Sequence, residues 1–168
     1  MRAMNILKII PATLRNRLVH ATGAGALAIA ALLVMHFEGL QHYPYRDTGG
    51  VITVCVGHTG ADIVWGRYYS TQECDAILKK DLATGERIVA RAIHQPIPDY
   101  LRGALISFAF NVGEGQFRTS TLVRKINARD LSGGCAELRR WIFDNGKKLN
   151  GLVNRREAEL WVCEGMPQ

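Results

Sequence analysis

Residues 35–58 read MHFEGLQHYPYRDTGGVITVCVGH, and this stretch decides how the chain folds. An apolar run reaches Glu38 and stops at Gly39, a pattern typical of the C-terminal end of a helix. Tyr43-Pro44-Tyr45 favours an extended path, because proline disfavours a helical conformation in the residue before it. Asp47-Thr48-Gly49-Gly50 indicates a turn, and the β-branched run Val51–Val56 predicts a strand. The chain therefore passes from helix to sheet within this stretch.

Helical patterns dominate the chain after a second turn at residues 57–60 and a short strand expected over residues 67–69. Ser70-Thr71-Gln72-Glu73 is a capping box, which predicts a long helix over residues 71–93. Two prolines then interrupt the pattern, and apolar residues at helical spacing predict a helix over residues 99–112. Further helices are expected from Ser120 and over about residues 134–143 and 154–163.

One short β region followed by several helices predicts an α+β protein of mostly helical content. The long helix would join a small β-containing lobe to a helical lobe. A cleft between two such lobes is a suitable place for a polymer substrate.

The charges are distributed unevenly along the 168 residues. The chain carries 21 Lys+Arg against 15 Asp+Glu, and all the acidic residues lie at or after Glu38. Residues 1–37 carry four basic residues, so this segment has a charge of +4 and the remainder 17 − 15 = +2. No basic stripe dominates the body, which argues against nucleic acid as a partner. The hydrophobic fraction of 48% excludes a disordered or collagen-like chain.

The N-terminal segment has the length of a membrane span. Residues 18–37 carry no formal charge, and as a helix they would extend about 30 Å, enough to cross a bilayer core. The basic residues Arg2, Lys8, Arg15 and Arg17 precede them, so the positive-inside rule places the N-terminus in the cytoplasm and the body outside. The segment is rich in Ala and Gly, and we expect it to be only marginally stable in a membrane.

Four interpretations of residues 18–37 compete. A cleaved signal peptide would need a small-x-small site after its apolar core, and none follows. A permanent anchor and a segment that inserts and later leaves the bilayer both fit, and we favour the second because of the marginal apolar character. A buried soluble helix does not suit a newly made chain, since the segment lacks a polar face. After release, however, the segment could pack onto the body.

Two carboxyl groups near the helix-to-sheet transition are candidates for chemistry. Glu38 follows an apolar run, and the partial desolvation expected there favours the protonated form that a general acid needs. Asp47 lies in a polar turn and should stay ionised. Two carboxyl groups in unlike environments are the arrangement required for glycoside hydrolysis. Alternation along the strand puts Ile52, Val54 and Val56 on the buried face and Thr53 on the side of Asp47, where its hydroxyl could hold a water molecule.

These residues resemble a known family. Glu38, eight residues, Asp47, five residues and Thr53, followed by Val54-Cys55-Val56-Gly57-His58, look like the signature of phage-type lysozymes, glycoside hydrolase family 24. The resemblance continues in three further motifs: Phe110-Asn111-Val112-Gly113, residues 115–122 (GQFRTSTL) and Asn154-Arg155-Arg156-Glu157. It covers about residues 35–165. The Ala- and Gly-rich N-terminus is similar to the signal-anchor-release segment of endolysins from lambdoid phages.

The resemblance implies a two-lobed lysozyme-like fold and an inverting muramidase. Such an enzyme would cleave the β-1,4 bond between N-acetylmuramic acid and N-acetylglucosamine in peptidoglycan. Glu38 would protonate the glycosidic oxygen, Asp47 with Thr53 would activate water, and Arg155 would be the cation facing Glu38. Residues that would line the saccharide cleft are Gly57, His58, Thr59, Phe110, Asn111 and Ser120. Without the resemblance, His58 reads as a structural residue, Phe110 as core and Arg155 as surface. No metal or organic cofactor is indicated, and we expect a monomer.

This family pattern divides the chain into a signal-anchor-release segment, residues 1–37, and a lysozyme domain, residues 38–168. One departure is that no polar spacer separates the apolar segment from Glu38, which predicts that membrane segment and catalytic helix form one continuous stretch. A protein tethered in the host inner membrane could then not dock Glu38 beside Asp47. It should be inactive until released to the periplasm.

The four cysteines leave several alternatives open. Cys55, Cys74, Cys135 and Cys163 permit two disulfides in an exported body. We favour Cys55–Cys74 and Cys135–Cys163, since each pair stays within one lobe, but four buried thiols fit equally well. Cys55-x-x-His58 could indicate a zinc site or a cysteine peptidase, yet the further ligands or the orienting group are missing.

Two other functions compete with hydrolysis. A lytic transglycosylase would use a Glu acid without the Asp/Thr pair and would leave a 1,6-anhydro end. A membrane-tethered wall-binding protein would need no catalytic acid.

Overall fold

The computed structural model describes residues 6–167 and has the predicted α+β fold of mostly helical content. Helix α3 (Ala26–Glu38) ends at Glu38, where Gly39 has a φ of +69°. Strand β1 (Gln41–Arg46) begins directly afterwards and pairs with β2 (Ile52–Cys55), which pairs with β3 (His58–Thr59). Both pairings are antiparallel. The helix-to-sheet transition expected from residues 35–58 is therefore confirmed.

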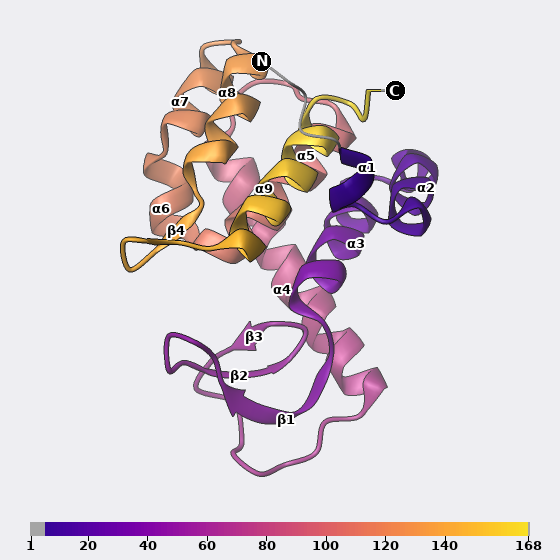
Figure 1. Ribbon diagram of the computed structural model, residues 1–168, viewed down its shortest axis with the longest axis vertical. Helices are drawn as coiled ribbons and strands as arrows, with labels where there is room; N and C mark the ends of the chain where they lie inside the picture. Colours follow the sequence, from indigo (N-terminus) through magenta and orange to yellow (C-terminus); the bar gives the residue numbers. More distant parts are fainter. Residues whose placement is uncertain (1–5, 168) are drawn as a thin grey trace.

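The sheet forms a small lobe that is separated from most of the helices (Figure 1). Helix α4 (Thr71–Ala92) runs from this lobe into the helical lobe, and Ser70 and Glu73 form the predicted capping box at its start. The short strand expected over residues 67–69 is wrong. This segment is an irregular loop, because Tyr69 is buried and its N–H donates to the carbonyl oxygen of His42 at 2.8 Å.

The helical lobe is built around α5 (Asp99–Val112) and α9 (Asn150–Cys163), which pack against each other. Between them along the chain lie α6 (Glu114–Thr119), α7 (Thr121–Asn127) and α8 (Leu131–Ala136). Helix α6 was not expected from the sequence, and α9 begins four residues before the predicted residue 154.

The helix predicted over residues 134–143 is only partly correct. Helix α8 is followed by a 3₁₀ turn, Glu137–Arg140, and by a hairpin of β4 (Phe143–Asp144) and β5 (Lys147–Lys148). Asn145 and Gly146 both have positive φ, 48° and 75°. An Asn-Gly pair in this conformation favours a tight hairpin turn, and it ends the helical path.

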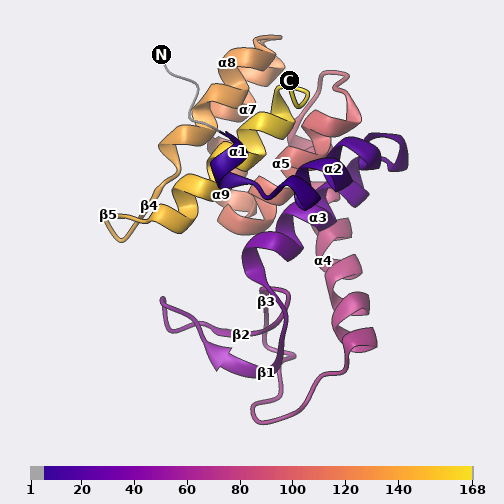
Figure 2. The ribbon, with the colours of Figure 1, turned by 45° about the vertical axis from the view of Figure 1, so that its right-hand side comes forward.

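The described part of the N-terminal segment, residues 6–37, lies on the helical lobe in two helices and most of α3. Helix α2 (Ala12–Ala21) leads through a 3₁₀ turn, Thr22–Ala24, to Gly25, whose φ of +91° breaks the path before α3 begins. The short α1 (Ile6–Ile9) contacts α9, and α2 contacts α3 (Figure 2). The continuous stretch expected over residues 18–37 is therefore divided, and only its second half shares a helix with Glu38.

Within the described residues, no helix combines the length and the apolar character needed to span a bilayer. Of the four basic residues that precede the apolar segment, Arg2 lies outside the described residues. Lys8 and Arg17 are exposed on the surface.

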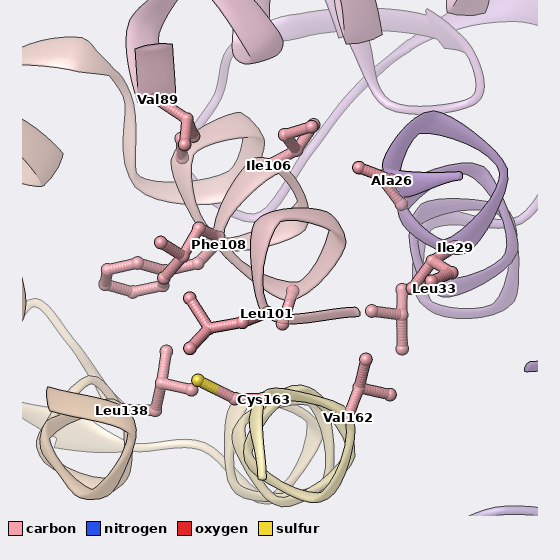
Figure 3. Packing of buried hydrophobic residues seen from close by; sticks show 14 of the residues in the cluster. Ala26, Ile29, Leu33, Val89, Leu101, Ile106, Phe108, Leu138, Val162 and Cys163 are labelled. Atoms are coloured by element: carbon pink, nitrogen blue, oxygen red, sulfur yellow. The ribbon is translucent and has the colours of Figure 1, made fainter. Parts of the chain in front are cut away.

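Helix α3 is part of the main hydrophobic core. Ile29, Leu33 and Val34 are fully buried, and Figure 3 shows Leu33 near Leu101 of α5 and Val162 of α9, with Ile29 beside Leu33. The crossing of α3 and α5 is close at Gly103, where a Cβ would lie 2.7 Å from Ile29 and 2.9 Å from the carbonyl oxygen of Ala26. The absence of a side chain at residue 103 thus permits this packing.

Two disulfides reinforce the lobes in the expected pairing. Cys55 is bonded to Cys74, which ties β2 to the first turn of α4. Cys135 is bonded to Cys163, which ties α8 to the end of α9. Neither bond crosses between the lobes, so neither restricts the opening of the cleft directly.

We predict that Gly103→Ala destabilises the protein by about 1–3 kcal/mol, because the added methyl group meets backbone as well as side-chain atoms. Urea unfolding followed by circular dichroism measures this change. Gly151→Ala is the matched control, since it also lies in a helix but its Cβ would meet nothing within 4 Å. The control should be neutral or more stable by up to about 1 kcal/mol. Equal effects at both positions would contradict close packing of α3 on α5.

Candidate active site

Glu38 lies where the helical lobe meets the small lobe. Its side chain is 23% exposed, and its Oε1 accepts a hydrogen bond from Nη1 of Arg155, whose side chain is only 5% exposed. Gly57, in the turn between β2 and β3, packs on the other side of the carboxyl group. A Cβ at residue 57 would come within 2.9 Å of Glu38 Oε2. The carboxyl group is thus held between a buried cation and a backbone turn.

Asp47 begins the turn between β1 and β2. Its Oδ1 accepts hydrogen bonds from the backbone N–H groups of Gly49 at 2.9 Å and Val51 at 2.8 Å. Two main-chain bonds also close this turn: Gly50 N–H donates to the Asp47 carbonyl oxygen at 2.9 Å, and Asp47 N–H donates to the Val51 carbonyl oxygen at 3.0 Å. The polar setting expected for Asp47 is present, and the turn fixes the direction of its carboxyl group.

Thr53 is buried in β2 with 4% exposure, and its hydroxyl donates to the Val51 carbonyl oxygen at 3.2 Å. The expectation that only Ile52, Val54 and Val56 face the interior is wrong. Thr53 and Cys55 are buried as well, and Ile52 is only half-buried. Cys55 has a φ of +58°, which breaks the alternation of the strand, and its disulfide to Cys74 brings α4 over this side.

Tyr45 is a site residue that sequence reasoning missed. It pairs with Thr53 across the sheet. It also lies two residues before Asp47, and side chains two residues apart in an extended chain point to the same face. Burial raises the pKa of the Tyr45 phenol, and the charges of Glu38 and Asp47 raise it further. This residue therefore lies within the field of both carboxyl groups. Its spacing of two from Asp47 was the signal that could have found it.

Three of the predicted cleft residues border one pocket between the lobes. Gly57, Thr59 and Phe110 line it together with residues of α4 and α5, among them Asp81, Thr84 and Ile88. The pocket adjoins Glu38, because Gly57 contacts both. This position matches the cleft expected where the long helix joins the lobes.

His58 has a structural role in this arrangement. Its Nδ1 lies 2.7 Å from Oδ2 of Asp81 in α4, and its Nε2 lies 3.2 Å from Oδ1 of Asp62. The bond to His58 lowers the pKa of Asp62 below its ordinary value. Both ring nitrogens are thus occupied, and the imidazole connects the β2–β3 turn to α4.

Asn111 and Ser120 differ in what they can offer to a ligand. Asn111 is exposed at the end of α5, and its Oδ1 accepts a hydrogen bond from Arg156. Ser120 is buried, caps α7 by accepting from the N–H of Val123 at 3.2 Å, and donates to the Phe117 carbonyl oxygen at 2.7 Å. It borders a second pocket with Gln116 and Arg140. The Ser120 hydroxyl therefore already donates to one main-chain group and accepts from another.

The rival zinc and cysteine-peptidase interpretations do not fit the donor groups. Cys55 and Cys74 are joined in a disulfide, so neither supplies a thiolate as a ligand or nucleophile. In the part of the chain that the structure describes, no three His, Cys, Asp or Glu side chains gather in a way that could hold a metal ion.

The fold and this arrangement of residues define a lysozyme-like protein, and comparison with known proteins agrees. Residues 35–159 match the family described as phage lysozyme, and the chain belongs to that family. The resemblance inferred from the motifs is thereby confirmed.

Its relatives include proteins named SAR-endolysin. That of Enterobacteria phage P21 is 48% identical over 160 residues, 92% of this chain and 97% of the relative. That of Escherichia phage Mu is 41% identical over 163 residues, 93% of this chain and 95% of the relative. Among solved structures, the active form of the P1 phage endolysin Lyz superposes with a TM-score of 0.75 at 25% identity, covering 93% of this chain and 95% of that one.

We predict that Glu38→Gln lowers the pKa of Tyr45 toward its ordinary value of about 10, because one of the two charges that raise it is removed. The pKa should remain above that value, since burial is the largest cause. Tyrosine Cζ chemical shifts followed by NMR against pH measure it.

Glu164→Gln is the control and should leave the Tyr45 titration unchanged, because Glu164 is not among the groups that act on Tyr45. The raised pKa also means that this phenol stabilises the fold below about pH 10 and that the contribution is lost as pH rises through the folded-state pKa.

An unchanged titration in Glu38→Gln would contradict the proximity of the two groups.

Proposed function

We propose that this protein is a phage endolysin that hydrolyses the β-1,4 bond between N-acetylmuramic acid and N-acetylglucosamine in peptidoglycan. The observation that carries the proposal is the pairing of Glu38 with buried Arg155 at the junction of the lobes, facing the turn that follows β2. Membership of the phage lysozyme family and the names of its relatives support a peptidoglycan hydrolase.

Glu38 acts as the general acid in this proposal. Arg155 donates to Oε1, which fixes the carboxyl group and leaves Oε2 as the oxygen that carries the proton. That proton passes to the glycosidic oxygen as the bond to the leaving sugar breaks. Because Arg155 is itself held by other buried groups, the carboxyl group needs no reorganisation when the sugar binds.

Asp47 and Thr53 position and activate the attacking water. The turn N–H groups hold Asp47 through Oδ1, and Thr53 lies on the strand that faces Tyr45. A water molecule activated on the face opposite the acid would invert the anomeric centre. A lytic transglycosylase needs no such water, so the Asp47–Thr53 side of the site supports hydrolysis.

We predict that Glu38→Gln lowers the rate of peptidoglycan cleavage by about 100- to 10,000-fold, the usual contribution of a general acid. Asp47→Asn should also remove most activity. The products of the unmodified protein should carry reducing ends, as determined by mass spectrometry of the released fragments. Fragments with 1,6-anhydro ends would instead identify a transglycosylase. Absence of cleavage by the unmodified protein, with wall binding spared in Glu38→Gln, would indicate a wall-binding protein, and full activity of Glu38→Gln would contradict the role of Glu38 as the acid.

The proposal includes a tethered and inactive form. Residues 18–37 would lie in the host inner membrane with the N-terminus in the cytoplasm, and release to the periplasm would let α3 pack on α5. Gly25 supports this idea, because its φ of +91° allows the break between α2 and α3 that the docked form requires. Peptidoglycan and the membrane would thus be the two partners of the chain.

We predict that leucine at both Gly23 and Gly25 holds the protein in the membrane and abolishes lysis. The substitutions add apolar surface for insertion, and a leucine at residue 25 is strained in the left-handed conformation of the docked form. Membrane fractionation and culture turbidity after expression measure the two effects.

Gly151→Leu is the control for added apolar surface, since it lies outside the segment in open space. It should fractionate and lyse as the unmodified protein does. Retained lysis by the Gly23→Leu and Gly25→Leu double variant would contradict release as the route to activity.

A further inference from the structure

A buried carboxylate on α9 connects the two sides of the site. Glu159 is fully buried, and its Oε1 accepts hydrogen bonds from the Ser107 hydroxyl at 2.7 Å and from Arg155 Nε at 3.2 Å. Its Oε2 accepts from Nη1 of Arg156. The spacings of four and three residues put both arginines on the same face of α9 as the glutamate. One carboxylate thus bridges two adjacent arginines.

Each arginine also reaches from Glu159 to a different residue of the site. Arg155 donates through Nη1 to Glu38, at the end of α3. Arg156 donates through Nη2 to Asn111, at the end of α5. Two further bonds steady this pair, from Arg155 Nη2 to the Ser107 carbonyl oxygen at 3.4 Å and from Arg156 Nε to the Trp141 carbonyl oxygen at 3.0 Å.

The charges explain why the carboxylate is required. Arg155 and Arg156 are 4% and 1% exposed, and neighbouring cations repel strongly when water is excluded. Burial lowers the pKa of the Arg156 guanidinium below its ordinary value, Glu159 opposes this, and the cation of Arg155 adds to it. Glu38 alone would leave two buried cations with one partly exposed anion.

We propose that Glu159 is a positioning residue for the reaction: it holds Arg155 against Glu38 and Arg156 against Asn111, and so couples the acid to the saccharide cleft. This inference rests on the proposed function. It adds to the family signature a residue four positions beyond Arg155, and it explains why two consecutive arginines are needed here.

The electrostatic consequence follows from the groups that act on Glu38. These are Arg155 and Arg156 of α9 and Tyr45 of β1, with Glu159 behind the arginines. Removing the charge of Glu159 takes away the anion that offsets these two cations, so the net charge facing Glu38 becomes more positive even where the Arg155 contact loosens. The alkaline limb of the pH–rate profile, where the acid loses its proton, should therefore move to lower pH.

Glu159→Gln is the main test, because glutamine keeps the shape and removes the charge. We expect kcat on purified peptidoglycan to fall by about tenfold to 100-fold at pH 7, as displacement of a catalytic group produces, with KM changed less than about twofold. The alkaline limb should shift to lower pH. Glu159→Asp, which retains the charge, should recover part of the rate and restore the limb.

Glu157→Gln is the matched control on the same helix. Glu157 is also buried and also pairs with an arginine, Arg139, at 2.6 and 2.9 Å, but it contacts neither Arg155 nor Arg156 by a hydrogen bond. Its substitution should lower stability without moving the pH profile. If Glu157→Gln shifts the limb as far as Glu159→Gln does, the positioning role is overturned.

A second measurement tests the contact between Arg155 and Glu159 directly and needs no activity assay. The Nε–H signal of Arg155 in ¹⁵N NMR should lose its protection from solvent exchange in Glu159→Gln, whereas that of Arg156, bonded to Trp141, should keep it. If Glu159→Gln does not fold, Ser107→Ala removes one hydrogen bond to the same carboxylate. It should reduce the protection of Arg155 Nε–H in the same direction and leave the alkaline limb in place, because the charge of Glu159 remains.

The outcomes separate this inference from the proposed function. An unmodified protein that does not cleave peptidoglycan overturns the proposed function, and the positioning role with it. Cleavage by the unmodified protein together with an unmoved pH profile and unchanged Arg155 protection in Glu159→Gln overturns the positioning role alone.

Discussion

The packing of α3 on α5 is the contact on which the rest of the structure depends. It requires glycine at residue 103, because the Cβ of any other residue would clash with the Ile29 side chain and the backbone of Ala26. Glu38 is the last residue of α3, so the same contact that completes the hydrophobic core also carries the carboxyl group to Arg155. Core formation and assembly of the site are therefore one event.

The contact between α3 and α5 places the boundary of the uneven charge distribution at the site. The acid-free residues 1–37 end at the carboxyl group that faces a buried arginine. Arg155 and Arg156 on α9 both donate hydrogen bonds to Glu159, which serves as their internal counterion. Contacts within the helical lobe therefore order this side of the site. The small lobe contributes the other side through the Asp47 turn and Gly57.

Local patterns predicted much of this molecule. The strand after the Asp47 turn, the capping box at Ser70 and both disulfide pairs depend on short-range sequence signals or on lobe membership, and all are confirmed. The family and its fold followed from several motifs at fixed spacing. Other features depend on tertiary contacts that no local pattern contains.

Three cases illustrate this limit. The break at Gly25 exists because α2 and α3 must fold back on the helical lobe, whereas the apolar sequence alone is continuous. Tyr45 becomes a site residue only when α3 brings Glu38 to β1. Glu159 was not singled out by any motif in the sequence, and only its complete burial beside two arginines distinguishes it.

Dependence of activity on the packing of α3 against α5 can be measured as the specific activity of the same protein in its membrane-bound and released forms. Open membrane fragments, in which added substrate reaches the periplasmic face, and the released soluble fraction can be assayed on identical purified peptidoglycan, normalised to protein amount. Cleavage should be confined to the released form, in which α3 lies on α5 and Glu38 meets Arg155. Equal specific activity in the two forms would contradict this dependence.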